Sequence, residues 1–235
     1  MSLKREIKIQ TIIISLIVSL MTILLLSIFL NFDLASNSLG KEILLTNGIS
    51  TQSANAVTSV VTYFRGFDTL GEVTILFLSI FGIGLGLEGY REKLNIFAYE
   101  NKLLTIAVDR LFPLIILFGF YIIIHGHLSP GGGFQGGVII ASAFLLMFLA
   151  KNDEFHLNHK LISLIESLSG ASFILIGVLG LLLADKFLGN FLPLGTMGEL
   201  LSAGVIPLIY IFVGIKVSAE ITALIEYFIR IKDVE

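Results

Sequence analysis

One uncharged stretch of this sequence is long enough to cross a membrane twice. Residues 111–150 contain no Asp, Glu, Lys or Arg, and a helix needs only about 20 apolar residues to span a hydrocarbon core. The whole chain has 235 residues, of which 55% are hydrophobic and 14% are charged, whereas soluble domains are about 25% charged. The chain is therefore predicted to be an all-α integral membrane protein surrounded by the lipid bilayer.

Six membrane spans are predicted from the stretches between charged residues. A Gly-rich segment interrupts residues 111–150, so this stretch is predicted to form two helices joined by a tight turn. The other four predicted spans occupy residues 9–32, 73–87, 167–184 and 200–215. Residues 73–87 and 200–215 are too short to cross a bilayer at 1.5 Å per residue. A flanking charge, such as Glu72 or Lys216, is therefore expected at membrane depth.

The distribution of positive charge predicts the orientation. Eleven Lys and Arg residues flank the predicted spans on one side, whereas the other side has only Lys41, Arg65 and Lys186. Because cytoplasmic loops carry the excess of positive charge, both termini are predicted to be cytoplasmic, in a multi-pass protein of the cell membrane. The net charge is −3 without a basic patch, so nucleic acid is not an expected partner.

The charged segment 88–110 separates two apolar blocks, and a boundary is predicted near residue 100. Residues 1–100 are predicted to form a two-helix module that includes an anchor helix, and residues 101–235 a four-helix membrane domain. An alternative is that the charged segment is an amphipathic helix at the membrane interface. The sequence shows no internal repeat of the kind found in self-sufficient transporters.

Two acidic residues, Asp68 and Glu72, are four positions apart and share one helix face if the helix begins at or before Asp68. Two acids on one face are suited to relaying a cation or a proton. The alternative is that Asp68 caps the helix and Glu72 pairs with Arg65. A carboxylate at membrane depth costs about 2.5–3.5 kcal/mol on insertion scales, which favours a functional role for Glu72.

The same predicted helix contains a pair of small residues, Gly82 and Gly86. Small residues at this spacing let a neighbouring helix backbone approach closely, so this is a predicted packing face. Gly82 to Glu88 is not expected to bind phosphate, because it lies in an apolar helix without a following Lys-Ser or Lys-Thr.

The Gly-rich segment 129–137 breaks the helical pattern, and its backbone groups need partners at membrane depth. Water or a neighbouring subunit is the expected partner. One interpretation is a broken-helix ion site in which His125 and His127 titrate. The other is a simple turn with both histidines at the outer interface, because residues two apart do not share a helix face.

Lys216 and Glu220 are four positions apart and are predicted to form an ion pair within the last span. The pair is either structural or one station of a proton chain. Glu166 and Glu199 are expected at the membrane interface. No nucleophile with a base, no cysteine and no metal motif is present, so no catalytic residue, metal site or bound cofactor is expected on this chain.

Several motifs carry a family resemblance. The run from His125 to Gly137, the run from Phe191 to Gly204 and Ile206-Pro-Leu-Ile-Tyr210 resemble the B-type subunit of Mrp-type multisubunit sodium/proton antiporters. Phe64-Arg-Gly-Phe-Asp-Thr-Leu-Gly-Glu72 resembles a module at the carboxyl end of the large, A-type antiporter subunit, which forms a separate small subunit in membrane-bound hydrogenases. Together the resemblances cover roughly residues 50–230.

The resemblance implies an accessory subunit that helps build a pathway for Na+ and H+ together with other antiporter membrane subunits. It places Asp68 and Glu72, and Pro130, Phe134 and Gln135 of the loop, near that pathway. The fusion of both modules in one chain favours a respiratory complex of the hydrogenase or sulfane-sulfur reductase type, with redox subunits that carry iron–sulfur clusters. The alternatives are a stand-alone Mrp-type antiporter and a purely structural scaffold.

Overall fold

The computed structural model describes residues 46, 50–87, 102–151, 155 and 157–230, together with residues 15–16, 19–20, 22–23 and 26–27. Every regular element in this part of the chain is a helix, which confirms the predicted all-α class. The chain divides into two compact units, Met1–Ile43 and Leu44–Glu235. The described residues of the first unit are helical and exposed, and most of the predicted first span lies outside the described residues.

The described part of the second unit contains five long helices: α4 (Gly66–Leu87), α5 (Lys102–Ile124), α6 (Gly133–Lys151), α7 (His159–Ala184) and α8 (Ile206–Arg230). Each contains a segment that is long and apolar enough to cross a membrane. Two short elements, α3 (Ala56–Thr58) and the π-helix η1 (Ser59–Phe64), precede α4. Five of the six predicted spans are thereby confirmed, and the cytoplasmic location of the termini stays a prediction.

The helices extend past the uncharged stretches that predicted them. α4 begins at Gly66, so Glu72 lies inside it as expected. α5 begins at Lys102, so the charged residues 102–110 are helical. The predicted boundary near residue 100 and most of the predicted interfacial helix lie outside the described residues, and the division into two modules stays a prediction.

The predicted last span, residues 200–215, is wrong at its start, whereas its expected extension past Lys216 is confirmed. Ala203 and Gly204 have φ values of 66° and 59°, which a right-handed helix does not contain, so α8 starts only at Ile206. Pro207 suits the first turn of α8, because amide N–H groups there have no partner within the helix and proline has no N–H to leave unpaired. α8 continues to Arg230 and thereby encloses Lys216 and two glutamates.

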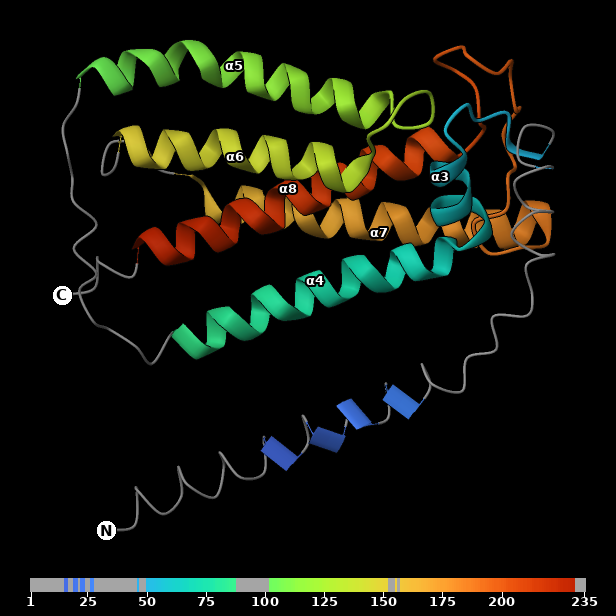
Figure 1. The fold of residues 1–235 in the computed structure, drawn as a ribbon, viewed down its shortest axis with the longest axis horizontal. Coiled ribbons are helices and arrows are strands. Elements are labelled where there is room, and N and C mark those ends of the chain that lie inside the picture. The colour runs from blue at the N-terminus through green and yellow to red at the C-terminus, as the bar shows by residue number, and fades with distance from the viewer. Residues whose placement is uncertain are drawn as a thin grey trace. The chain divides into compact units, whose positions relative to one another are not determined.

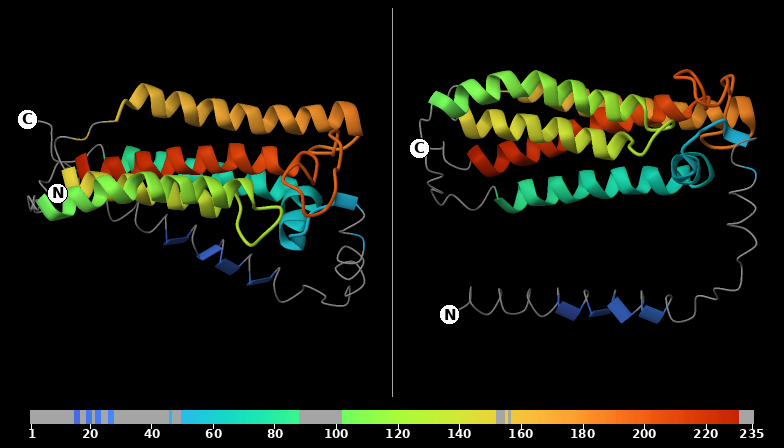
Figure 2. Two further views of the ribbon diagram at one scale, coloured as in Figure 1. Left: turned by 90° about the horizontal axis from the view of Figure 1, so that it is seen from above. Right: turned by 45° about the horizontal axis from the view of Figure 1, so that its top comes forward.

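Helix α8 is the central element of the second unit, because it contacts α4, α5, α6 and α7. Figure 1 shows α6 lying between α5 and α8, and the views in Figure 2 place α7 and α5 on opposite sides of α8. The buried apolar cluster joins α4, α7, α8 and the segment between α7 and α8; its members include Val73, Phe173, Ile176, Leu188 and Val213. α8 therefore carries charged residues through the middle of the bundle.

Glycines of the Gly-rich segment also pack the bundle. A Cβ atom at Gly133 would stand 2.8 Å from the carbonyl oxygen of Tyr210, and one at Gly137 would stand 2.9 Å from that of Gly214. Real Cβ atoms do not approach this closely, so these two positions set the distance between α6 and α8. The sequence predicted a helix break here and missed the packing role.

The predicted packing glycines of α4 have no such neighbour. In the described part of the chain, no atom of another element lies within 4 Å of a Cβ atom built at Gly82 or Gly86. Both residues are exposed. Close packing at Gly82 and Gly86 therefore stays a prediction. The helix that packs there would belong to another polypeptide or to residues outside the described part of this chain.

Replacing Gly137 by valine is expected to push α6 away from α8 and to cost about 1–3 kcal/mol of stability, because the added side chain would overlap the α8 backbone. The midpoint of thermal unfolding in detergent measures this effect. Gly71→Val is the matched control, since Gly71 lies in a helix with open space around it. Equal midpoints for the two variants would contradict the close helix approach.

Candidate functional site

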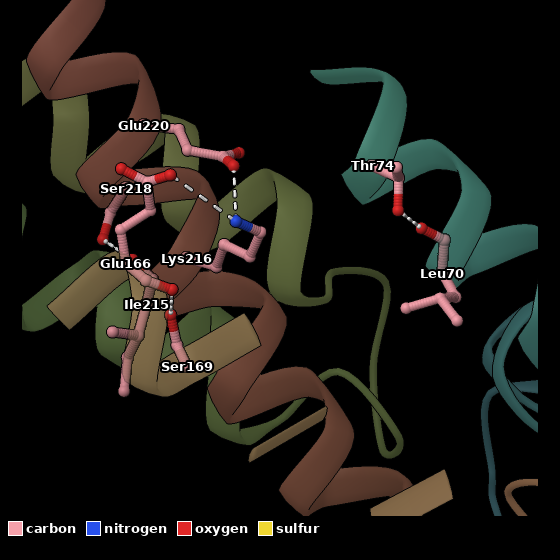
Figure 3. A network of polar contacts seen from close by, with 8 residues as sticks. All are labelled: Leu70, Thr74, Glu166, Ser169, Ile215, Lys216, Ser218 and Glu220. Atoms are coloured by element: carbon pink, nitrogen blue, oxygen red, sulfur yellow. Dashed lines mark hydrogen bonds and ion pairs between the residues drawn. The ribbon is translucent and has the colours of Figure 1, made fainter. Parts of the chain in front are cut away.

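A buried cluster of three charged side chains joins α7 and α8. Lys216 Nζ lies 2.6 Å from Glu220 Oε1 and 3.8 Å from Glu166 Oε1. Figure 3 shows the ammonium between the two carboxylates. The ion pair between Lys216 and Glu220 is the predicted one. Glu166, which was expected at the membrane interface, points toward Lys216, and its side chain is 19% exposed.

The cluster is enclosed by protein on several sides. The side chains of Lys216 and Glu220 are 12% and 1% exposed. The centroid of the Phe77 ring, on α4, lies 5.1 Å from Lys216 Nζ. At this distance a cation is attracted to the face of an aromatic ring. Gly170 of α7 leaves room for the lysine side chain. Three helices thus surround one ammonium group inside a membrane-spanning bundle.

The cluster has one more carboxylate than ammonium group. With all three side chains ionised its net charge is −1, and an uncompensated charge in a buried site costs several kcal/mol. A proton or a bound cation removes this excess. The arrangement is therefore suited to take up and release one positive charge, and it contains a residue, Glu166, that sequence reasoning missed. The one sequence signal for Glu166 was that the small residues Ser169 and Gly170 follow it by three and four positions. This spacing puts all three residues on one face of α7, and that face meets α8.

The acidic pair of α4 lies elsewhere. Asp68 is in the first turn of α4 and is not its cap, and it accepts a hydrogen bond of 2.6 Å from Arg65 Nε. The alternative in which Arg65 pairs with Glu72 is wrong, because Arg65 pairs with Asp68. Glu72 is exposed on the same helix face as Asp68, whereas Phe77 of that helix faces Lys216. The described residues do not bring Glu72 into the buried cluster.

The Gly-rich hairpin is held by residues 53–58 of the same chain. Asn55 Nδ2 donates hydrogen bonds of 2.9 Å to the carbonyl oxygens of Gly126 and Ser129. The hydroxyls of Ser53 and Thr58 donate to the carbonyls of His127 and Gly126 at 2.9 and 2.6 Å. Within the Gly-rich segment, the Ser129 carbonyl therefore has a partner from this chain, where water or a neighbouring subunit was expected. The segment just before η1 supplies this partner.

The two histidines have different surroundings. His125 Nδ1 lies 3.0 Å from the carbonyl oxygen of Tyr121, and the two rings stack with centroids 4.1 Å apart. His127 is completely buried in the loop between α5 and α6. Burial lowers the pKa of His127 from its ordinary value of 6.5, and nearby backbone groups, that of Glu199 first, oppose this shift only in part.

The three loop residues that the resemblance singled out do not converge. Pro130 and Gln135 are exposed, whereas Phe134 packs against the buried apolar cluster. Glu199, expected at the interface, is an exposed residue of the segment between α7 and α8. A role of Pro130, Phe134 and Gln135 in an ion pathway stays a prediction.

Replacing Asn55 by aspartate is expected to loosen the hairpin while keeping the start of α3. Aspartate retains the oxygen that accepts from Val57 N and Thr58 N, but it loses the amide that donates to Gly126 and Ser129. Gly126 keeps its hydrogen bond from Thr58, so the Ser129 carbonyl is the one left without a partner, which costs about 1–3 kcal/mol. Hydrogen exchange measures the effect at the amides of Leu128 and Ser129. Unchanged protection there, with normal assembly, would contradict the role of Asn55.

Acidification is expected to destabilise the hairpin through His127. Because its pKa is lower in the folded state, the folded protein binds this proton less readily than the unfolded chain. The contribution to stability is complete above about pH 6.5 and is lost as the pH falls below that value. The fall in the unfolding midpoint between about pH 8 and pH 5 is therefore expected to be smaller in His127→Gln than in the unchanged protein.

Comparisons with known proteins agree with this architecture. The model of a domain related to the MnhB subunit of Na+/H+ antiporters matches residues 103–223. The protein MJ1307 of Methanocaldococcus jannaschii is 31% identical over 194 residues, which cover 72% of this chain and 74% of that protein. The putative antiporter subunit mnhB2 of Staphylococcus aureus strain Newman is 54% identical over 56 residues, 23% of this chain and 40% of that protein.

Two solved structures are similar. A chain of the membrane-bound sulfane sulfur reductase, an archaeal respiratory membrane complex, is 36% identical with a TM-score of 0.73, and the match covers 92% of this chain and 98% of that one. A chain of the Mrp complex from Dietzia sp. DQ12-45-1b shares the fold, at 22% identity and a TM-score of 0.66, over 83% of this chain and 23% of that one. The chain therefore belongs to the family that carries the domain related to the MnhB subunit of Na+/H+ antiporters.

Proposed function

We propose that this chain is an accessory membrane subunit of the antiporter module of a larger respiratory membrane complex. The observation that carries the proposal is its similarity, along almost the whole of both chains, to one chain of the archaeal sulfane sulfur reductase complex. That match covers 92% of this chain and therefore extends over residues of both predicted modules. Its partners would be other antiporter-type membrane subunits and, beyond them, redox subunits with iron–sulfur clusters.

The contribution of this chain would be a wall of the cation and proton pathway. The buried cluster of Lys216, Glu220 and Glu166 supports this role, because it holds one positive charge fewer than it needs for neutrality. The transported ions would be Na+ and H+. Asp68 and Glu72, exposed on α4, and the histidines of the hairpin would belong to the same pathway only where other subunits complete it.

A purely structural scaffold is the competing function, and the exposed face of α4 favours it. Gly82 and Gly86 lie on this face with open space around them, and Glu72 shares it. A second helix packed on this face would bury both glycines. A scaffold needs no transferable charge, so the two functions differ in what happens when the ion pair of the buried cluster is removed.

The double variant Lys216→Met and Glu220→Gln is expected to abolish cation-dependent proton movement while the complex still assembles. Changing both partners avoids an unpaired buried carboxylate at residue 220, which alone would destabilise the bundle by about 3–5 kcal/mol. Sodium-dependent ΔpH in inverted membrane vesicles that contain the complete complex is the measurement. Normal transport by an assembled complex would leave only the scaffold function.

The matched control is Ser218→Ala. Ser218 lies on α8 between the two altered positions, and its hydroxyl bonds to the carbonyl of Ile215 in its own helix. This variant is expected to assemble and transport normally. Blue native electrophoresis of each membrane preparation separates lost assembly from lost transport.

A further inference from the structure

A second buried ionisable group lies near the carboxyl end of α8. The side chain of Glu226 is 1% exposed, and His159 Nε2, from the first turn of α7, lies 3.5 Å from its Oε1. The histidine side chain is 66% exposed. The pair therefore joins a group that solvent reaches to a carboxyl group that solvent does not reach. Sequence reasoning missed both residues, because residues far apart in the chain form the pair.

A surface hollow adjoins the exposed histidine. Its volume is about 450 Å³, and it is lined by His159, Lys160, Ser163, Leu164 and Ser167. Ser163 and Ser167 follow His159 by about one and two turns of α7, so their hydroxyl groups lie along the helix between His159 and the level of Glu166. The hollow is open to the outside, and the side chain of His159 is itself 66% exposed. Water can therefore reach His159 from the side of the helix.

The pair lies slightly less than two helical turns from the cluster of Lys216, Glu220 and Glu166, along both α7 and α8. Glu226 follows Glu220 by six residues on α8, a rise of about 9 Å, and His159 precedes Glu166 by seven on α7, a rise of about 10 Å. Thr222 lies between the two glutamates in sequence, and its buried hydroxyl has no hydrogen-bond partner among the described residues. Such a hydroxyl is suited to bind a bridging water. Ionisable groups thus stand about 10 Å apart along α7 and along α8, with a buried hydroxyl between the two glutamates in sequence.

We propose that His159 and Glu226 form the aqueous entrance through which protons reach this cluster. A proton from water or buffer binds Nε2 of His159, passes from there to the Glu226 carboxylate, and leaves His159 neutral and ready for the next proton. From Glu226 it moves through bound water near Thr222 to the Glu220 and Glu166 carboxylates. The inference rests on the proposed function. It adds the end of the bundle from which protons enter the cluster.

Replacing His159 by alanine is expected to slow sodium-dependent ΔpH formation at least about tenfold, as loss of a positioned proton-transfer group typically does. Added imidazole is expected to restore the rate, because the position is exposed and a soluble imidazole can occupy the vacated space. Glu226→Gln is expected to slow transport similarly without rescue, since soluble imidazole cannot reach a side chain that is 1% exposed. Both are measured in vesicles that contain the complete complex.

Two control variants match these positions. Leu161→Ala shortens an exposed side chain in the same turn of α7, and Tyr227→Phe removes a hydroxyl from the exposed neighbour of Glu226. Both are expected to transport at the unchanged rate with or without imidazole. If Glu226→Gln does not assemble, Glu226→Asp replaces it. Because aspartate keeps the carboxyl group, this variant is expected to transport faster than any assembled variant that has no carboxyl group at position 226.

The outcomes separate this inference from the proposed function. Normal transport by an assembled His159→Ala complex would show that His159 is not the proton entrance. A loss of transport that imidazole does not restore would show the same. If the Lys216 and Glu220 double variant still loses transport in the same vesicles, the proposed function survives that result. If the double variant transports normally, the proposed function itself is wrong.

Discussion

The burial of Lys216 between two carboxylates is the interaction on which the rest of this bundle depends. An ammonium group inside a membrane-spanning helix persists only with charged or polar partners, and α8 can supply just one of them, Glu220, from its own turn. Glu166 must come from α7, and the aromatic face of Phe77 comes from α4. The electrostatic requirement of one side chain therefore positions three helices. It also explains why α8, with its charges, is the central and not a peripheral helix.

The Gly-rich hairpin shows a second constraint, that of backbone hydrogen bonding away from bulk water. Its carbonyl oxygens accept hydrogen bonds from Ser53, Asn55 and Thr58, so residues just before η1 complete a turn that lies more than 60 positions later in the chain. Tyr210 of α8 donates to Thr58 at 3.1 Å and ties the same segment to the central helix. Specific polar contacts therefore join residues 53–58 to the hairpin and to α8.

The outer face of α4 has the opposite character. Glu72, Gly82 and Gly86 are exposed on a helix that is apolar enough to span a membrane, and the described residues leave the space beside both glycines open. A carboxylate facing lipid is costly, so a face of this composition is suited to contact another protein subunit. In the proposed complex this face would meet a neighbouring antiporter subunit, while the buried cluster faces the interior of the chain itself.

The sequence by itself determined the membrane class, five of the described spans and the ion pair of Lys216 with Glu220. These depend on local quantities, namely apolar length and spacing along one helix. It also required a charge inside the two spans that were too short, and α4 and α8 both contain charged residues. Only the tertiary structure decided that Glu166 faces Lys216, that His159 meets Glu226 and that Asn55 holds the hairpin. Such contacts join residues from different helices, and helix rotation and crossing, which local spacing does not specify, bring them together.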